Sequence, residues 1–194
     1  MKKISILVVL IAFVTMIFNP CPNPVITKLG IDMEKSSIFW KGYKPTGTHD
    51  GSLNFTSGTL EVNEGKVKGG EFTVDMTTIK DREGNKRLEG HLNSADFFEV
   101  EVYPSSSFVI KSVNTNDGEL TITGDLTIKG ITKDISFGAT FDAKGDTYVL
   151  TSEKFQVNRA DFNVKFNSKT FFNDLKEKFI NDEFDLQVTI VAGK

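Results

Sequence analysis

The length of 194 residues and the formal net charge of −3 fit a single mildly acidic domain and exclude a nucleic-acid-binding protein of the usual basic kind. Phosphate binding draws on a clustered excess of basic side chains, whereas this chain has 23 Lys and Arg against 26 Asp and Glu. Cys21 is the only cysteine, which excludes an internal disulfide, so a body of residues 31–194 must be held together by its hydrophobic core.

Residues 1–24 form an apolar N-terminal segment with the pattern of a secretory signal peptide. Lys2 and Lys3 precede an apolar run over residues 4–18, and a proline-rich stretch follows. The run is shorter than the roughly 20 residues that a membrane span needs. The pattern therefore predicts export. Two alternatives stay open, namely an uncleaved anchor that contacts the membrane and lipidation of Cys21.

From residue 31 onward, short segments alternate apolar and polar residues, which is typical of β-strands with one buried face. Gly, Asn and Asp at the breaks indicate tight turns, which leave no room for the long crossovers of a parallel sheet. About eight or nine antiparallel strands are predicted, in chain order 38–43, 53–62, 72–76, 108–113, 120–128, 135–141, 148–157, 162–166 and 184–190.

Two stretches break this alternation. Apolar residues recur at helical spacing in residues 87–98 and again between residues 172 and 179, which predicts two short helices. A sheet with one apolar face must cover it, and closing into a barrel also removes the exposed edges. We therefore predict an all-β fold, a single antiparallel β-barrel of about eight strands with one or two short helices.

The polar faces of the predicted strands carry many carboxylates, as a solvated exterior does. A barrel of the outer membrane would instead turn its apolar face outward to lipid. The carboxylates in question are Glu61, Glu71, Asp75, Glu99, Glu101, Glu119, Asp134 and Asp185. We therefore expect the apolar faces to point into the barrel.

Motifs that carry catalysis are not found. The two histidines, His49 and His91, have no second ligand at metal spacing. Asp81, Glu83 and Asn85 resemble the opening of a calcium loop, but the distal glutamate of such a loop is missing. There is no nucleophile turn and no phosphate-binding loop. We therefore predict a protein that is not an enzyme and has no metal and no cofactor.

Phenylalanine is abundant, with seventeen in the chain. The rings could pack against one another in a filled core, which composition by itself favours. They could equally line a cavity, because ligand sites are mostly apolar and aromatic with few polar groups. Composition therefore leaves both interpretations open, the filled core and the lined cavity.

Several short motifs occur in a fixed order over nearly the whole body. They are residues 37–40 (SIFW), 47–51 (GTHDG), 70–76 (GEFTVDM), 88–98 (LEGHLNSADFF), 103–104 (YP), Phe108, 124–133 (GDLTIKGITK) and 158–162 (NRADF). In this order they resemble the YceI-like family of polyisoprenoid-binding proteins. The resemblance implies a lipocalin-like barrel, a periplasmic location, and a polyisoprenoid or isoprenoid quinone bound inside. The chain departs from the family at residues 181–183 and by an insertion at residues 171–178.

Alternation selects the residues that we expect to form the wall of a ligand site. They are Trp40, Phe55, Phe72, Val74, Met76, Phe108, Ile110, Leu126, Ile128, Phe137, Phe162, Phe166, Phe184 and Leu186. Three more, Leu92, Phe97 and Phe98, are expected to plug one end of the barrel. Three polar residues, His49, His91 and Arg159, are candidates for contact with a head group, with the fixing of a turn or strand end as the alternative role of each.

The predicted function is the binding and carriage or storage of a long apolar lipid. The predicted partner is an isoprenoid-type lipid and not nucleic acid, and a homodimer is left open. The alternative is an exported structural or interaction barrel with a filled core and no ligand.

Overall fold

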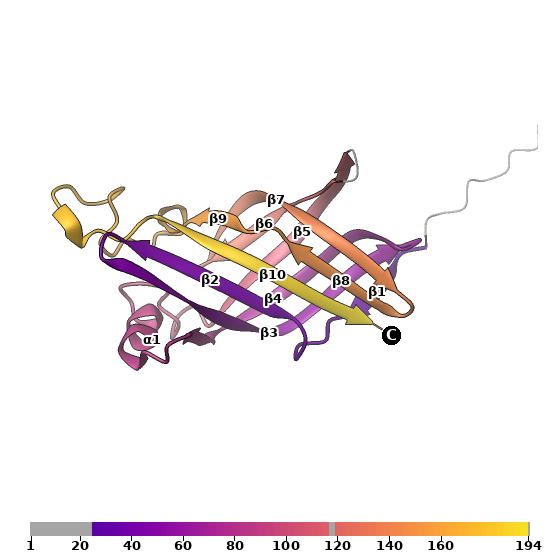
Figure 1. The fold of residues 1–194 in the computed structure, drawn as a ribbon, viewed down its shortest axis with the longest axis horizontal. Helices are drawn as coiled ribbons and strands as arrows, with labels where there is room; N and C mark the ends of the chain where they lie inside the picture. The colour runs from indigo at the N-terminus through magenta and orange to yellow at the C-terminus, as the bar shows by residue number, and fades with distance from the viewer. Residues whose placement is uncertain (1–24, 117–118, 194) are drawn as a thin grey trace, which may run out of the picture.

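In the computed structural model, which describes residues 25–116 and 119–193, ten β-strands form one antiparallel sheet (Figure 1). They are β1 (Thr27–Gly30), β2 (Ser37–Lys44), β3 (Gly47–Asn63), β4 (Lys66–Asp81), β5 (Ser105–Asn116), β6 (Glu119–Ile128), β7 (Ile131–Lys144), β8 (Thr147–Ser152), β9 (Phe155–Asn158) and β10 (Glu183–Gly193). The helical elements are α1 (Lys86–Asn93) and two 3₁₀ turns, η1 (Arg159–Phe162) and η2 (Lys176–Lys178). The predicted signal segment lies outside the described residues.

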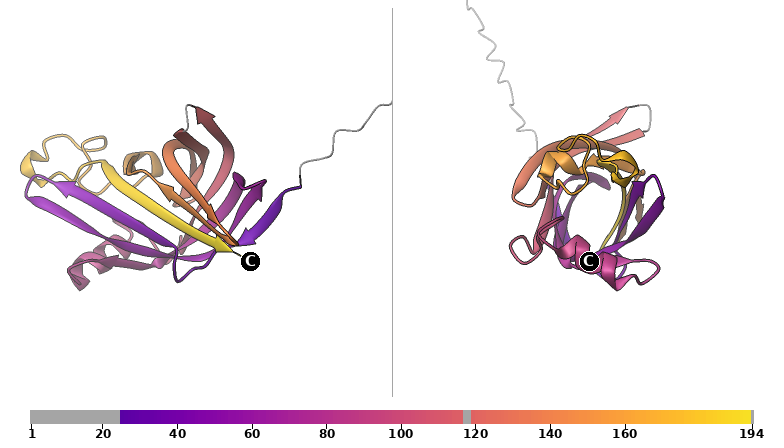
Figure 2. Two further views of the ribbon diagram at one scale, coloured as in Figure 1. Left: turned by 45° about the vertical axis from the view of Figure 1, so that its right-hand side comes forward. Right: turned by 90° about the vertical axis from the view of Figure 1, so that its left-hand side faces the viewer.

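The sheet closes into a barrel, as predicted. Eight strands form the ring in the order β2, β3, β4, β5, β6, β7, β8 and β10, and β10 pairs back onto β2. β9 pairs with the first residues of β10, whereas β8 pairs with the last ones. β1 pairs with the second half of β3, and Ile31, just after β1, forms a bridge with Ala192 of β10. Figure 2 shows the ring end-on in its right-hand view.

The barrel is elongated because three of its strands are long. β3 has 17 residues, β4 has 16 and β7 has 14. Register shifts interrupt the pairing of β3 with β4 at three places, and such bulges bend a strand and increase its twist. The first half of β3 can therefore pair with β2 while its second half pairs with β1.

The two ends of the barrel differ. At the end where the β3–β4 and β7–β8 hairpins lie, the interior is filled by apolar side chains that are at most 4% exposed. They are Leu29, Leu60, Val62, Val67 and Ala192. The opposite end carries α1, the β2–β3 hairpin and the segment 163–182 (Figure 1). We call these two ends the closed end and the mouth.

The predicted strand at 162–166 is wrong, since this stretch contains η1 and irregular turns. The Asn158 side chain accepts a hydrogen bond from Ala160 N at 2.9 Å and begins η1, and Asn163, with φ +60°, ends it. The local caps therefore override an alternation that fits a strand. The second predicted helix is also wrong, because only the three residues of η2 are helical there.

The first predicted helix is present but shorter. Asn85 Oδ1 accepts a hydrogen bond from Leu88 N at 3.1 Å and caps α1. The helix ends at Asn93, and Ser94 begins a series of turns. Residues 94–98, predicted as helix, therefore belong to a turn region.

Asp185 corrects the expectation of a uniformly solvated exterior, because it is only 1% exposed. Its carboxylate accepts hydrogen bonds from Tyr43 Oη at 2.5 Å and Gln156 Nε2 at 3.1 Å, and Lys154 Nζ lies 3.2 Å away. Burial would raise the pKa of Asp185, but these hydrogen bonds and the lysine charge outweigh burial and lower the pKa.

Candidate ligand-binding site

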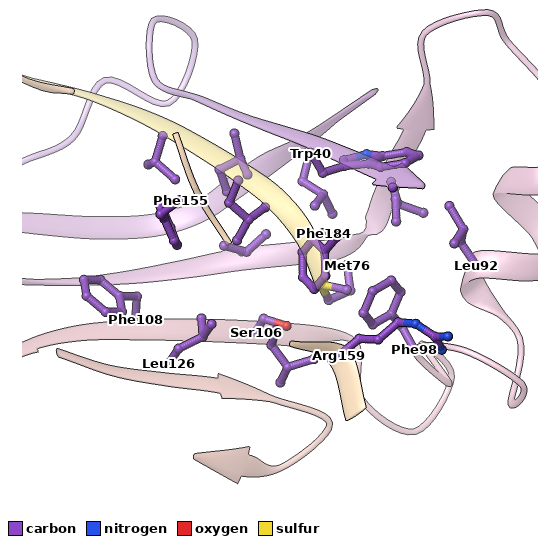
Figure 3. Close-up of a pocket in the computed structure, with 18 of the residues that line it drawn as sticks. Trp40, Met76, Leu92, Phe98, Ser106, Phe108, Leu126, Phe155, Arg159 and Phe184 are labelled. Carbon is purple, nitrogen blue, oxygen red and sulfur yellow. The ribbon is translucent and has the colours of Figure 1, made fainter. Parts of the chain in front are cut away.

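The barrel holds a cavity of about 340 Å³ that extends toward the mouth. This volume lies within the range of roughly 300–1,000 Å³ that is usual for small-molecule sites. Figure 3 shows side chains from several strands pointing into it, with Phe108 and Leu126 deep in the barrel and Leu92 and Phe98 near the mouth. The apolar faces of the strands thus enclose a space that protein atoms do not fill.

Sixteen of the seventeen residues selected as wall or plug residues line this cavity. They are Trp40, Phe55, Phe72, Val74, Met76, Leu92, Phe97, Phe98, Phe108, Ile110, Leu126, Ile128, Phe137, Phe166, Phe184 and Leu186. The period of two along a strand accounts for the twelve that lie on strands, since alternate side chains share one face. That they contact a ligand stays a prediction.

Phe162 is the predicted wall residue that does not line the cavity. It is 1% exposed and packs with Leu126, Ile128 and Val157 in a separate apolar cluster. Because η1 replaces the predicted strand, the ring is directed into this cluster and stabilises the barrel wall.

The wall also contains apolar residues that we did not select. They are Ile38, Leu53, Ile79, Leu88, Ile122, Ile135, Leu150, Phe155, Ile180, Val188 and Ile190. Most share a strand face with a selected residue, so alternation could have found them. Phe155 is different. In an unbroken strand 148–157 it would face opposite to Leu150, but the break after Ser152 shifts the phase by one residue and brings it inside.

Aromatic rings line the cavity at two levels. Deep in the barrel, Phe137 stacks on Phe155 with a centroid distance of 4.3 Å, and Phe108 lies 5.5 Å from Phe137. Near the mouth, the His91 ring contacts Phe166 edge-on at 4.5 Å. Such pairs stabilise by about 0.5–1.5 kcal/mol beyond their buried area, and they fix the shape of the wall.

Each histidine has a carboxylate neighbour. His49 Nδ1 lies 3.5 Å from Asp81 Oδ1, and His91 Nε2 lies 3.4 Å from Asp96 Oδ2. Asp81 also accepts hydrogen bonds from the backbone N–H of Glu83 and Asn85, both at 3.1 Å. The apparent calcium loop is therefore a turn that Asp81 organises.

A second, polar hollow of about 420 Å³ adjoins the mouth. Its lining consists of Lys44, His49, Asn85, Arg87, Leu88 and His91, four of which also line the main cavity. Both histidines therefore lie where the cavity meets its polar surroundings, which suits the predicted contact with a head group as well as the fixing of turns.

Arg159 is 4% exposed and organises the mouth. Its Nε, Nη1 and Nη2 donate hydrogen bonds to the carbonyl groups of Asn181, Val164 and Ile180 at 3.0, 2.9 and 3.0 Å. Nη2 also lies 3.3 Å from Asp182 Oδ1. Burial lowers the pKa of Arg159 and the nearby carboxylates oppose that shift, but a guanidinium stays charged in proteins. The contacts favour the alternative role, the fixing of a chain segment.

Two buried polar side-chain atoms in the wall have no hydrogen-bond partner among the described residues. They are Trp40 Nε1 and Ser106 Oγ. Both side chains are more than nine-tenths buried, and both line the cavity (Figure 3). A β-carbon at Gly51 would come within 2.9 Å of the Trp40 ring, so the close approach of β3 helps to hold the indole in place.

Neither residues 25–116 nor residues 119–193 contain three or more His, Cys, Asp or Glu side chains grouped as a metal site. Within the same ranges, no helix has the length and apolar character to cross a membrane.

Comparison with models of known protein families matches residues 30–192 to the YceI-like domain. The chain belongs to the YceI-like family. The ordered motifs had indicated this membership, and the match confirms it. The residues that it covers include the whole barrel ring except Gly193, the last residue of β10.

Curated relatives of this YceI-like chain match over part of its length. A UPF0312 protein of Pseudomonas putida is 34% identical over 96 residues, which are 49% of this chain and 50% of the relative. Protein YceI of Escherichia coli O157:H7 is 32% identical over 96 residues, which are 50% of each chain. The chain thus spans about half the length of the curated relatives it matches.

Solved structures extend the likeness to most of the barrel. BcnA of Burkholderia cenocepacia superimposes with a TM-score of 0.69 and 22% identity, over 84% of this chain and 99% of BcnA. A polyisoprenoid-binding domain of Saccharophagus degradans does so with a TM-score of 0.63 and 11% identity, over 85% and 97% of the two chains. At these identities the likeness shows the shared fold alone.

Proposed function

We propose that this YceI-like protein binds a long apolar lipid inside its barrel and carries or stores it outside the cytoplasm. The observation that carries the proposal is the cavity itself, about 340 Å³ of interior lined mainly by apolar side chains. A filled barrel would leave no such volume. The closed end, with Leu60 at 0% exposure, shows that this sequence does fill its interior elsewhere.

Hydrophobic burial suffices for useful affinity. Each buried CH₂ contributes roughly 0.8 kcal/mol, so ten buried carbons give about 8 kcal/mol before ordering costs. That gross value corresponds to a dissociation constant of about 1 µM. No charged anchor inside the cavity is required, which fits the apolar wall.

The ligand class is an isoprenoid, either a polyisoprenoid or an isoprenoid quinone. Support comes from the Saccharophagus degradans structure of the same fold, which is described as a polyisoprenoid-binding domain. Trp40 Nε1 and Ser106 Oγ add a preference for a lipid that bears an oxygen acceptor, because a buried donor without a partner costs about 1–3 kcal/mol. Carriage by a non-catalytic, exported protein completes the proposal, and export is supported by the pattern of residues 1–24.

The first experiment extracts the purified protein with organic solvent and identifies bound lipid by mass spectrometry. Protein from an isoprenoid-replete host should yield a stoichiometric isoprenoid, and an empty extract would contradict the proposal. Val74→Trp places a large ring in the cavity and should lower the lipid content severalfold while the barrel stays folded. Val109→Trp is the matched control, because Val109 lies on the outer face of β5 and is 44% exposed.

If the protein is instead a structural barrel with a filled core, the opposite result is expected for Val74→Trp and Val109→Trp. Val74→Trp would then overpack the core and destabilise it by about 1–3 kcal/mol, and neither variant nor wild type would yield lipid. Urea denaturation of the two variants separates these outcomes.

A further inference from the structure

The segment 163–182 projects from the mouth of the barrel beyond the strands. Figure 1 and the left-hand view of Figure 2 show it, in yellow, at the same end as the β2–β3 hairpin and α1. Both ends of the segment are held in place. Arg159 donates to the carbonyl groups of Val164 at one end and of Ile180 and Asn181 at the other. Thr170 also donates from N and Oγ1 to Asp182 Oδ2 at 3.2 and 2.8 Å. We call this segment the docking loop.

The docking loop exposes two adjacent aromatic rings. Phe171 is 40% exposed and Phe172 is 48% exposed. Among the described residues, they are the only aromatic side chains in the set of exposed large hydrophobic residues. Neither ring lines the cavity, so the wall of the ligand site does not explain their placement.

Lysine side chains lie on the same loop as these rings. The loop carries four lysines against three acidic residues, Asp174, Glu177 and Asp182, of which Asp182 is buried beside Arg159. Its formal charge is therefore +1, whereas the whole chain carries −3. Lys165 Nζ lies 5.2 Å from the centroid of the Phe171 ring, and Lys169 Nζ lies 3.3 Å from that of Phe179. The loop therefore combines a local positive charge with exposed aromatic surface.

This combination fits the interface of an anionic bilayer. Aromatic rings are favourable at the boundary between head groups and acyl chains, and each Lys near an anionic surface contributes about 1 kcal/mol. The Debye length is about 8 Å at physiological salt, so acidic groups farther along the barrel are screened from that surface. At the same end, α1 and the neighbouring turns carry charges of both signs, as in the ion pairs Lys86–Glu89 and Arg82–Asp50.

We propose that the docking loop binds the surface of an anionic phospholipid bilayer and holds the mouth of the cavity against it. An apolar lipid then passes between bilayer and barrel without crossing water. This inference rests on the proposed function, because docking serves the transfer of a lipid that the barrel binds. Bilayer binding and lipid content are nevertheless measured in separate experiments.

The test uses the full chain with a tryptophan reporter on the loop. Phe172→Trp keeps an aromatic ring, and Val109→Trp is the reporter on the barrel wall. Wild type, which has only Trp40, provides the baseline. Each protein is mixed with vesicles of phosphatidylglycerol and phosphatidylcholine that carry brominated acyl chains, which quench a tryptophan at the interface. Fluorescence of Phe172→Trp should be quenched, and Val109→Trp should show no more quenching than wild type.

Charge reversal then tests the lysines. In the Phe172→Trp background, Lys169→Glu with Lys176→Glu should weaken vesicle binding at least about tenfold, because two attractive charges become repulsive. Lys66→Glu with Lys144→Glu makes the same change of charge at the closed end and should have little effect. High salt or vesicles of phosphatidylcholine alone should abolish the quenching.

Three results would overturn the proposal: equal quenching of the two reporters, equal effects of the two charge reversals, or no quenching at all, as expected if the loop binds an acidic protein. Solvent extraction of the same variants tests lipid carriage independently of bilayer docking. Lipid-filled protein without quenching rejects docking alone, and quenched protein with an empty barrel rejects carriage alone.

Discussion

Trp40 and Ser106 differ from the rest of the cavity wall because each offers a polar atom that the described protein atoms do not satisfy. An indole N–H is a donor only, whereas a hydroxyl both donates and accepts. A ligand oxygen acceptor beside either group would satisfy it, and a pure hydrocarbon would satisfy neither. These two side chains are therefore where selectivity between isoprenoids is expected.

Trp40→Phe retains an aromatic ring and removes the N–H group. Wild-type protein freed of lipid should bind geranylgeraniol more tightly than squalene beyond any difference in buried area. Trp40→Phe should reduce this preference by about 0.5–1.5 kcal/mol, the usual net value of one hydrogen bond, and Ser106→Ala should act similarly. Calorimetric titration of each protein with the two lipids measures this difference in binding free energy. Phe108→Leu is the control, since it should weaken both lipids alike, and an unchanged preference in both test variants would refute the assignment.

Residue-scale prediction from the sequence succeeded where side-chain direction follows from strand period alone. Burial of Asp185 could not be predicted, because Tyr43 and Gln156 cover it from strands that are distant in sequence. The unpaired state of Trp40 Nε1 likewise depends on what its neighbours in space provide. Both are tertiary properties that an alternation pattern does not contain.

At the scale of elements, Arg159 is the link between the barrel and the docking loop. Lysine keeps the charge but cannot donate to three carbonyl groups in a fixed fork. Arg159→Lys should lower the free energy of unfolding by about 2–4 kcal/mol, since hydrogen bonds to charged groups contribute roughly 1.5–3 kcal/mol each. Hydrogen exchange at Val164 and Ile180 should also become faster.

Arg82→Lys supplies the comparison. Arg82 is an exposed partner of Asp50, with Nη2 and Oδ2 2.8 Å apart, and such pairs contribute about 0–1 kcal/mol. Urea denaturation of both variants measures the difference between their free energies of unfolding. If Arg159→Lys lowers the free energy of unfolding no more than Arg82→Lys does, the carbonyl contacts do not anchor the loop.

The sequence predicts a strand or helix best where its apolar residues recur at a regular spacing. The ring strands follow a period of two and were recognised. The strand at 162–166 was predicted because Phe162, Val164 and Phe166 alternate, yet the caps at Asn158 and Asn163 turn this stretch into η1 and a loop. The break between β8 and β9 was also missed, and with it the inward placement of Phe155.

For the whole molecule, Asp185 links barrel stability to acid pH. Its folded-state pKa is lower than that of an unfolded Asp, about 3.9, so its stabilising contribution is complete well above this value. The contribution is lost as the pH falls through the unfolded and then the folded pKa. Asp185→Asn should therefore be less stable than wild type at about pH 7, with the difference shrinking at about pH 3.

Urea midpoints across this range measure the effect, and Asp134→Asn is the control because Asp134 is exposed on β7. A stability difference for Asp185→Asn that stays constant with pH would show that the carboxylate charge is not what stabilises this region.

The packing of Leu29, Leu60 and Val67 makes the barrel a tube that is blind at one end. A chain-like guest must then enter and leave by the same opening, with its tail leading on the way in. Guests shorter than the tube would disappear into it, whereas longer ones would keep their leading tail inside and leave their remaining units protruding among the polar groups of the mouth. Depth, rather than width, would then decide how many prenyl units contribute to affinity.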